Sequence, residues 1–225
     1  APGSNNPTLW PTILRRNSPA YTNRIFRIGA ATGTLAHVTI RNGSGWNGLK
    51  GGGILVTNST FTLDGCRIVT NEIYGANLQY MYMYGGALYA SASAIVITNC
   101  YFAGNRIYGS WRRGHNQGGC GYFTGGSLLI VNSEFLDNDS AGGGSALIPD
   151  YSSYGGALYA DCPLTIRSSV FAGNSATVGG GSKFNNHRSA VLRGGRLGRH
   201  FPEVRDRLTA FSRVPDLGRE MTSLP

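Results

Sequence analysis

The chain has 225 residues, of which 41% are apolar and only 14% are charged, and it contains 34 glycines and 12 tyrosines. This balance argues against a helical bundle and favours a tightly turning β structure. The formal net charge is +9, and residues 182–225 supply five of these nine charges, because they hold nine Lys or Arg against four Asp or Glu. No apolar run is long enough to span a bilayer, so no transmembrane segment is expected.

The repeating part of the chain begins near Arg27. Residues 1–26 precede it and are interpreted as an N-terminal extension or cap. The next residues read as a first, degenerate coil, in which Val38 and Ile40 alternate with polar residues before the loop SGWNGLK at 44–50.

Four segments then repeat two anchors, a glycine pair followed by a short apolar run and an aromatic residue or Ile three residues before Asn. They are GGGILVTNSTFTLDGCRIVTN (51–71), GGALYASASAIVITNCYFAGN (85–105), GGCGYFTGGSLLIVNSEFLDN (118–138) and GGALYADCPLTIRSSVFAGN (155–174). The spacers at 72–84, 106–117 and 139–154 are unlike one another. This pattern indicates one coil that is repeated, with loops inserted at the same corner.

Within each segment the apolar residues alternate with polar ones and short turns interrupt them, which predicts several brief strands rather than a helix. Hairpin turns such as Asn-Gly are missing within the segments, so each strand is expected to pair with its equivalent in the next repeat. We therefore expect an all-β fold, a parallel β-helix of about five coils over residues 27–181, stacked at about 4.8 Å per coil.

Two columns of identical or similar side chains follow from this stacking. Asn71, Asn105, Asn138 and Asn174 fall at one register and are predicted to form a structural ladder of hydrogen-bonded amides. Ile68, Phe102, Phe135 and Phe171 fall at another register and are predicted to stack inside the coil.

The paired motifs resemble those of a known family. GGALYA at 85–90 and 155–160, with FAGN at 102–105 and 171–174 and FLDN at 135–138, resembles the GGA(I/L/V) and FxxN repeats of the chlamydial polymorphic outer-membrane proteins. The match covers residues 51–181. The resemblance implies a right-handed coil, an extracellular or cell-surface location and an adhesin role, without cofactor or catalytic chemistry in the repeats.

Residues 182–225 abandon the repeat pattern and are interpreted as a basic tail or cap. Between Pro202 and Pro215, the spacing of Val204, Leu208 and Phe211 predicts a short helix that covers the last coil. The alternative is that the tail docks onto an acidic protein, glycan or lipid surface. Nucleic acid is not an expected partner, because the basic residues follow no recognised binding motif.

The cysteines leave two interpretations open. Cys66 and Cys100 occupy equivalent sites in adjacent coils, close enough for a disulfide, or they are stacked free thiols. Cys120 and Cys162 are not expected to pair. No CxxC spacing occurs, and no metal site is expected.

Two sequons, at Asn42 and Asn58, are candidate N-glycosylation sites if the chain passes through a eukaryotic secretory pathway. A third, at Asn138, falls on the ladder.

Enzymes with this fold place carboxylates on one face, and the acidic candidates here are Glu134, Asp137, Asp139, Asp150 and Asp161. Asp137 and Asp139 flank a ladder residue and are weak catalytic candidates that could also bind a cation. The alternative is a solvated pair of turn aspartates. The four histidines share no register, so a histidine base is not expected.

The spacers carry most of the candidate binding residues. Because the spacers leave the stack at one corner, they are expected to gather the following residues on one side of the molecule: Tyr74, Tyr80, Tyr82, Tyr84, Tyr108, Trp111, Arg112, Arg113, Tyr151 and Tyr154. Aromatic residues with arginine are typical of interface hot spots and of sugar-binding surfaces. The alternative is that these loops bury their own rings against the coil.

The sequence thus predicts an adhesin-like extracellular module, without enzymatic activity or cofactor, that binds a protein partner or a surface glycan. Two alternatives remain. One is a subunit of a larger assembly or filament, docked through the tail or the coil ends. The other is a polysaccharide-active lyase or hydrolase.

Overall fold

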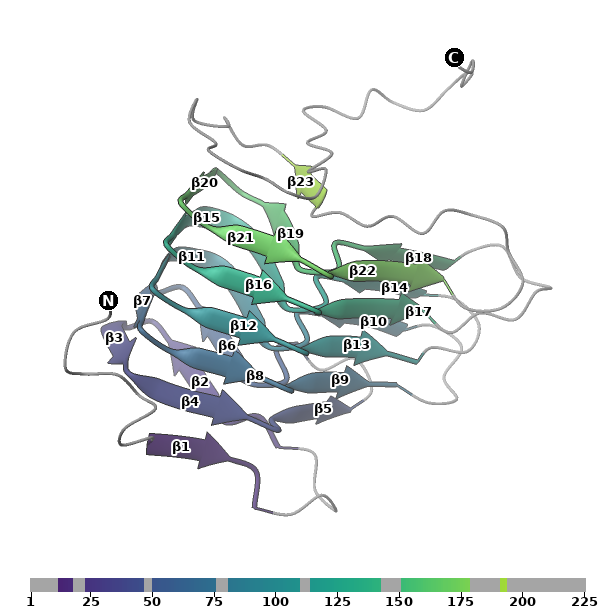
Figure 1. Ribbon diagram of the computed structural model, residues 1–225, viewed down its shortest axis with the longest axis horizontal. Coiled ribbons are helices and arrows are strands. Elements are labelled where there is room, and N and C mark those ends of the chain that lie inside the picture. Colours follow the sequence, from purple (N-terminus) through teal and green to yellow (C-terminus); the bar gives the residue numbers. More distant parts are fainter. Residues whose placement is uncertain are drawn as a thin grey trace.

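The computed structural model describes residues 12–17, 23–46, 50–75, 81–109, 114–142, 151–178 and 191–193. Within these residues the protein is all-β, without a helix, and it folds as a parallel β-solenoid (Figure 1). Every strand pairs in parallel with its equivalent in the preceding or following turn, so the expected parallel β-helix fold is confirmed. No helix of the described residues is long and apolar enough to cross a membrane.

Four sheets run along the solenoid axis. Sheet A contains β1 (Thr12–Arg15), β4 (Val38–Arg41), β8 (Arg67–Val69), β12 (Tyr101–Ala103), β16 (Glu134–Leu136) and β21 (Val170–Ala172). Sheet B contains β2 (Phe26–Gly29), β3 (Thr32–Ala36), β6 (Ile54–Thr57), β7 (Thr60–Asp64), β11 (Leu88–Thr98), β15 (Gly121–Val131), β19 (Leu158–Asp161), β20 (Leu164–Arg167) and β23 (Val191–Arg193). Sheet C contains β5 (Ser44–Trp46), β9 (Glu72–Tyr74), β13 (Arg106–Tyr108), β17 (Asp139–Gly142) and β22 (Ser175–Val178). Sheet D contains β10 (Met81–Tyr84), β14 (Gly114–Gln117) and β18 (Tyr151–Tyr154).

In the described part, three successive turns contribute a strand to all four sheets, and they begin at β6, β11 and β15. The turns before and after them contribute to sheets A, B and C but have no described strand in sheet D. The solenoid thus has about three complete turns, and the expected five coils are not confirmed. The right-handed sense stays a prediction, and the expected helix between Pro202 and Pro215 lies outside the described residues.

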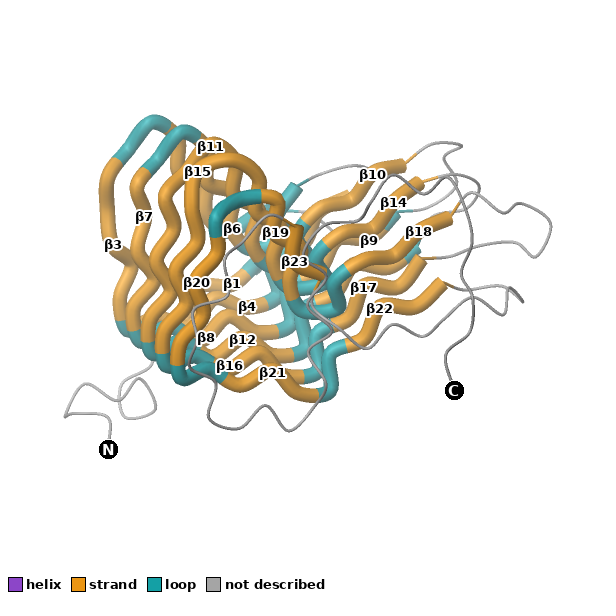
Figure 2. Tube along the Cα trace, turned by 90° about the horizontal axis from the view of Figure 1, so that it is seen from above, coloured by secondary structure: helices purple, strands orange, loops and turns teal. Residues whose placement is uncertain are grey.

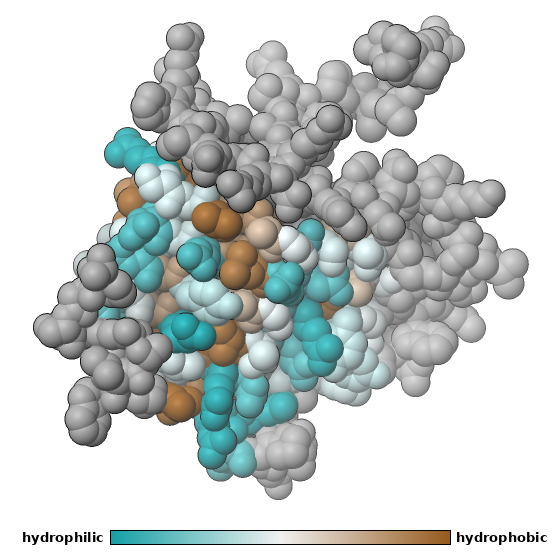
Figure 3. Space-filling view, viewed as in Figure 1, coloured by the Kyte–Doolittle hydropathy of each residue, from teal (hydrophilic) through white to brown (hydrophobic). Residues whose placement is uncertain are grey.

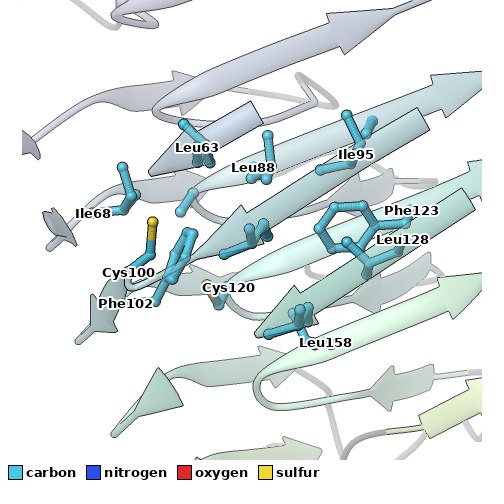
Figure 4. Packing of buried hydrophobic residues seen from close by; sticks show 14 of the residues in the cluster. Leu63, Ile68, Leu88, Ile95, Cys100, Phe102, Cys120, Phe123, Leu128 and Leu158 are labelled. Carbon is cyan, nitrogen blue, oxygen red and sulfur yellow. The ribbon is translucent and has the colours of Figure 1, made fainter. Parts of the chain in front are cut away.

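The cross-section has two lobes, each with its own core. Sheets A and B enclose the large core, whose side chains point inward from successive turns (Figure 4). Phe102, Phe135 and Phe171 stack there, with centroids 4.6 and 4.7 Å apart, and Ile68 is the register partner of Phe102. Sheets C and D extend from this body (Figure 2) and contribute the small core of Ile73, Met83 and Ile107.

A narrow waist separates the two lobes, and the glycine pairs form one side of it. Gly85 has a positive φ of 65°, which turns the chain from sheet D into sheet B. Its neighbour Gly86 has no room for a side chain, since a Cβ would lie 2.1 Å from the Gly119 carbonyl oxygen and 2.5 Å from that of Arg106. The second glycine is therefore required by close approach of three backbone segments.

The asparagines predicted to form a ladder line the other side of the waist. Nδ2 of Asn71, Asn105 and Asn138 donates to Oδ1 of the next asparagine at 3.0, 2.9 and 2.8 Å, and the backbone N–H of each donates to the same oxygen at 3.0 Å. A Cβ on Gly53 would lie 3.0 Å from the Asn71 side chain. The two repeat motifs thus face each other across the waist, which explains why they recur together.

On the face of the molecule seen in Figure 3, hydrophobic residues are interspersed with hydrophilic ones. The exposed apolar side chains of sheet A include Ile13 and Val170, which lie at opposite ends of the sheet. This face offers single apolar side chains rather than a continuous apolar patch.

Candidate binding surface

Outward-facing tyrosines gather where sheet D joins sheet B. Strand alternation explains their direction, because Leu88 points into the core and the following Tyr89 points out. We call this surface the tyrosine corner. It consists of Tyr82 and Tyr84 of β10, Tyr154 of β18, and Tyr89, Tyr122 and Tyr159, which are register partners in sheet B.

The rings of the tyrosine corner are in contact with one another. The Tyr122 ring stacks on those of Tyr89 and Tyr159, with centroids 5.3 and 5.1 Å apart and planes within 4°. Tyr84 of sheet D lies 4.6 Å from the Tyr122 ring. The outward side chains of sheets B and D therefore meet at this corner.

The corner has a buried base and an exposed rim. Tyr89 and Tyr159 are only 6% and 8% exposed, whereas Tyr82 and Tyr154 are 48% and 39% exposed. Burial raises the pKa of Tyr122 to about 12 and also raises the pKa of Tyr84. Their phenols stay protonated at neutral pH, so the corner presents neutral hydroxyl groups that both donate and accept hydrogen bonds.

Two basic side chains touch these rings. Lys50 Nζ lies 4.9 Å from the Tyr89 centroid and 5.6 Å from that of Tyr84, and it donates to the Tyr89 hydroxyl at 3.3 Å. The His115 ring of β14 lies between Tyr82, at 5.4 Å, and Tyr154, at 6.3 Å. Among the described residues, His115 Nδ1 is buried and has no hydrogen-bond partner.

The structure brings together some of the predicted binding residues and separates others. Tyr82, Tyr84 and Tyr154 share the tyrosine corner. Tyr108 lies on the outer face of sheet C with Tyr74, at 4.8 Å, and the small core separates it from sheet D. The expectation of one aromatic face is therefore wrong for Tyr108. Tyr80, Trp111, Arg112 and Arg113 lie outside the described residues, and Tyr151 is described only by its backbone.

Sequence reasoning missed the base of the corner. Tyr89, Tyr122 and Tyr159 occupy one position of the aligned segments, the third residue after each glycine pair. Strand alternation places their side chains on the outer face of sheet B. On sheet C, Trp46 was also missed, whereas Tyr74 was expected among the gathered spacer residues and lies with Tyr108 instead. The similar tetrapeptides EIYG (72–75) and RIYG (106–109) could have predicted that Tyr74 and Tyr108 are register partners.

The acidic candidates are spread over several faces. Asp137 occupies a left-handed corner before sheet C, and Asp139 Oδ1 accepts a hydrogen bond from Ser175 Oγ at 2.6 Å. Both lie across the waist from the tyrosine corner. Glu134 lies in sheet A, Asp161 ends β19, and Asp150 falls outside the described residues. Across the described ranges, no group of three His, Cys, Asp or Glu side chains could hold a metal ion.

All four cysteines are buried free thiols in this structure. Cys66 and Cys100 lie in one column, where the Cys66 N–H donates to Cys100 Sγ at 3.4 Å and the Cys100 N–H donates to Ser133 Oγ at 3.1 Å. The interaction of the Cys100 thiol with the Cys66 thiol, together with burial, raises the pKa of Cys100, although the Cys66 N–H lowers it, and burial raises the pKa of Cys120. Cys66 and Cys100 thus fill the position that serine takes in the next turn.

Thiol accessibility distinguishes this arrangement from a disulfide. A small alkylating reagent at neutral pH should leave the native thiols unmodified, because they are buried and Cys100, Cys120 and Cys162 have raised pKa values. After unfolding without reductant, mass spectrometry should show all four alkylated. Only two alkylated cysteines, with four after reduction, would instead indicate that Cys66 and Cys100 had formed a disulfide.

The sequons lie at exposed corners of the coil. Asn42 and Asn58 both have positive φ values, 58° and 50°, and both are exposed. Asn42 Oδ1 accepts a hydrogen bond from Thr70 Oγ1 at 2.8 Å, while Asn138 is fully buried in the ladder. Asn42 and Asn58 therefore stay candidate glycosylation sites on the ground of accessibility.

Comparison of the chain with protein-family models, curated proteins and solved structures yields no match. The structure supports the parallel repeat fold, and the resemblance to the chlamydial repeats stays a prediction from the sequence motifs.

Proposed function

We propose that the protein is an extracellular or cell-surface binding module, adhesin-like in role, whose contact surface is the tyrosine corner. The observation that carries this proposal is the convergence of outward tyrosines from sheets B and D in one corner. The resemblance of the paired motifs to surface-exposed right-handed repeats supports the location and the handedness of the coil.

The arrangement of the corner suits binding better than it suits stability alone. Tyr89 and Tyr159 are locked by stacking, while Tyr82 and Tyr154 keep a large exposed area above them. Tyrosine presents rigid contact area at a low entropic cost, and its hydroxyl group adds hydrogen bonds. A protein partner or a surface glycan could use such a surface.

Removal of the exposed rings tests the proposal. Retention of the full chain should be measured on a panel of immobilised neutral polysaccharides, acidic polysaccharides and extracellular-matrix proteins. For the ligand that retains the parent protein, Tyr82→Ser with Tyr154→Ser should raise Kd about tenfold or more, because exposed aromatic anchors dominate such interfaces.

The matched control is Tyr101→Ser. Tyr101 is a partly exposed tyrosine of sheet A that packs under the Arg67 guanidinium at 4.6 Å, away from the corner. The control should keep the Kd of the parent, and all variants should keep its melting temperature within a few degrees. An equal loss in control and double variant would refute the corner as the contact surface.

A further inference from the structure

The described part of the solenoid is electrically polar along its axis. Residues 12–75 hold seven Lys or Arg against two Asp or Glu, a net +5, whereas residues 81–178 hold four against five, a net −1. The first turns are therefore basic and the later turns nearly neutral. This polarity bears on the tyrosine corner, because the corner runs along the axis from one region into the other.

Three cations lie at the basic end of the corner. Arg27 is the register partner of Leu55, and Leu55 is the partner of Tyr89, so the exposed Arg27 continues the outward column of tyrosines in sheet B. Arg24 Nε donates to the Gly51 carbonyl oxygen at 2.8 Å, and its Nη2 donates to the carbonyl oxygen of Lys50. Arg24 is thereby held beside Lys50, whose ammonium group contacts the rings of Tyr84 and Tyr89.

The charge of Arg27 acts on Arg24, and Arg24 binds the backbone of Lys50, but none of the three cations has a carboxylate partner among the described residues. Burial, and then the nearby charge of Arg27, lowers the pKa of Arg24. Among the described residues none of the three forms an ion pair, while the Glu72 carboxylate is paired with Arg106 at 3.0 Å on sheet C. Crowded positive charges of this kind are relieved when an anion binds between them.

The shape of the corner favours one class of polyanion. An extended peptide can bind by pairing with an exposed sheet edge, but the strands that line the corner are already paired and present their side-chain faces. A row of neutral phenols in contact over successive turns instead offers ring edges and hydroxyl groups to a chain of sugars lying along the axis. The charged groups of such a chain would lie near Arg27, at the end of the corner where the described cations are found.

We infer that the tyrosine corner binds an acidic polysaccharide, with a carboxylate or sulfate group of the polymer seated among Arg24, Arg27 and Lys50. This inference rests on the proposed function and adds the chemical class of the ligand. The tyrosines supply the contact area, and the cations supply the selectivity for charged over neutral chains.

The test compares a neutral polymer with its sulfated form, and both with a carboxylated polymer. Affinity electrophoresis of the full chain in gels containing dextran, dextran sulfate or polygalacturonate gives Kd for a neutral, a sulfated and a carboxylated chain. We expect retardation by at least one acidic polymer and at least tenfold weaker retardation by neutral dextran. For the acidic polymer, Arg27→Gln with Lys50→Gln should raise Kd about tenfold and flatten its dependence on salt concentration.

The control carries the same change of net charge elsewhere. Arg67→Gln with Arg167→Gln removes two positive charges from the outer faces of sheets A and B, away from the corner, and should change Kd less than twofold. The basic residues of the tail are unchanged in both variants, so their non-specific attraction cancels. All the side chains replaced lie at the surface, and an unchanged melting temperature would show that each variant folds.

The possible outcomes separate the inference from the function on which it rests. Equal retardation by dextran and dextran sulfate, with loss in the Tyr82 and Tyr154 variant, would keep the binding function and overturn the acidic class. Equal weakening by both charge variants, or tighter binding of poly-glutamate than of any polysaccharide, would also overturn it. If no polymer or protein of the panel retains the parent chain, the proposed function itself fails.

Discussion

Replacing Gly86 with alanine is expected to destabilise the solenoid by about 4 kcal/mol or more, enough to leave much of the chain unfolded at 25 °C. The added Cβ would lie 2.1 Å from the Gly119 carbonyl oxygen and 2.5 Å from that of Arg106. Both atoms belong to strongly paired backbone segments, so no flexible side chain can move aside. Urea unfolding followed by circular dichroism should show the loss as a lower midpoint.

Gly33→Ala is the matched control. It is the same change in a strand of sheet B, and the nearest atoms to its new Cβ are ring carbons of Phe61 at 4.0 Å, an ordinary contact distance. Alanine there should leave the unfolding midpoint unchanged or slightly higher, because it lowers the entropy of the unfolded chain. If Gly86→Ala behaved like Gly33→Ala, the waist would have to be wider than the structure shows.

Only part of the structure of the waist could be predicted from the sequence. The glycine pairs and the asparagines were visible as repeat anchors, because each recurs at one place in every coil. The contact between these two anchors was not visible in the sequence, because Gly53 and Asn71 approach each other only in the folded coil, at the waist between the two lobes. Nothing in a single repeat distinguishes a glycine needed for a turn, such as Gly85, from one needed for close approach, such as Gly86.

The candidate site was predicted less completely than the stack. Strand alternation and repeat alignment place Asn105 above Asn71 and Phe135 beside Phe102, because those relations are set within the coil. The positions of the spacer side chains could not be predicted from the alignment of the repeats. They form sheets C and D around their own small core, so Tyr84 and Tyr108 point to opposite sides of one lobe although both come from spacers.

Asn105→Ala is the second substitution for which a large loss is expected. The fully buried Asn105 side chain donates to Asn138 Oδ1 at 2.9 Å and to the Ile68 carbonyl oxygen at 2.8 Å. Its Oδ1 accepts both the N–H and the Nδ2 of Asn71, each at 3.0 Å. Alanine would leave several of these buried groups unpaired at about 1 to 3 kcal/mol each, so a total loss of about 4 kcal/mol is expected in urea unfolding.

Asn99→Ala separates burial from hydrogen bonding as the source of that loss. Asn99 also belongs to a stacked pair, because it donates to Asp64 Oδ1 at 2.9 Å and accepts from Asn132 Nδ2 at 2.7 Å, but it is exposed. Water can replace these bonds, so the remaining cost is about 1 kcal/mol for alanine at a positive φ of 54°. A loss at Asn99 as large as that at Asn105 would mean that burial is not what makes the Asn105 hydrogen bonds costly to remove.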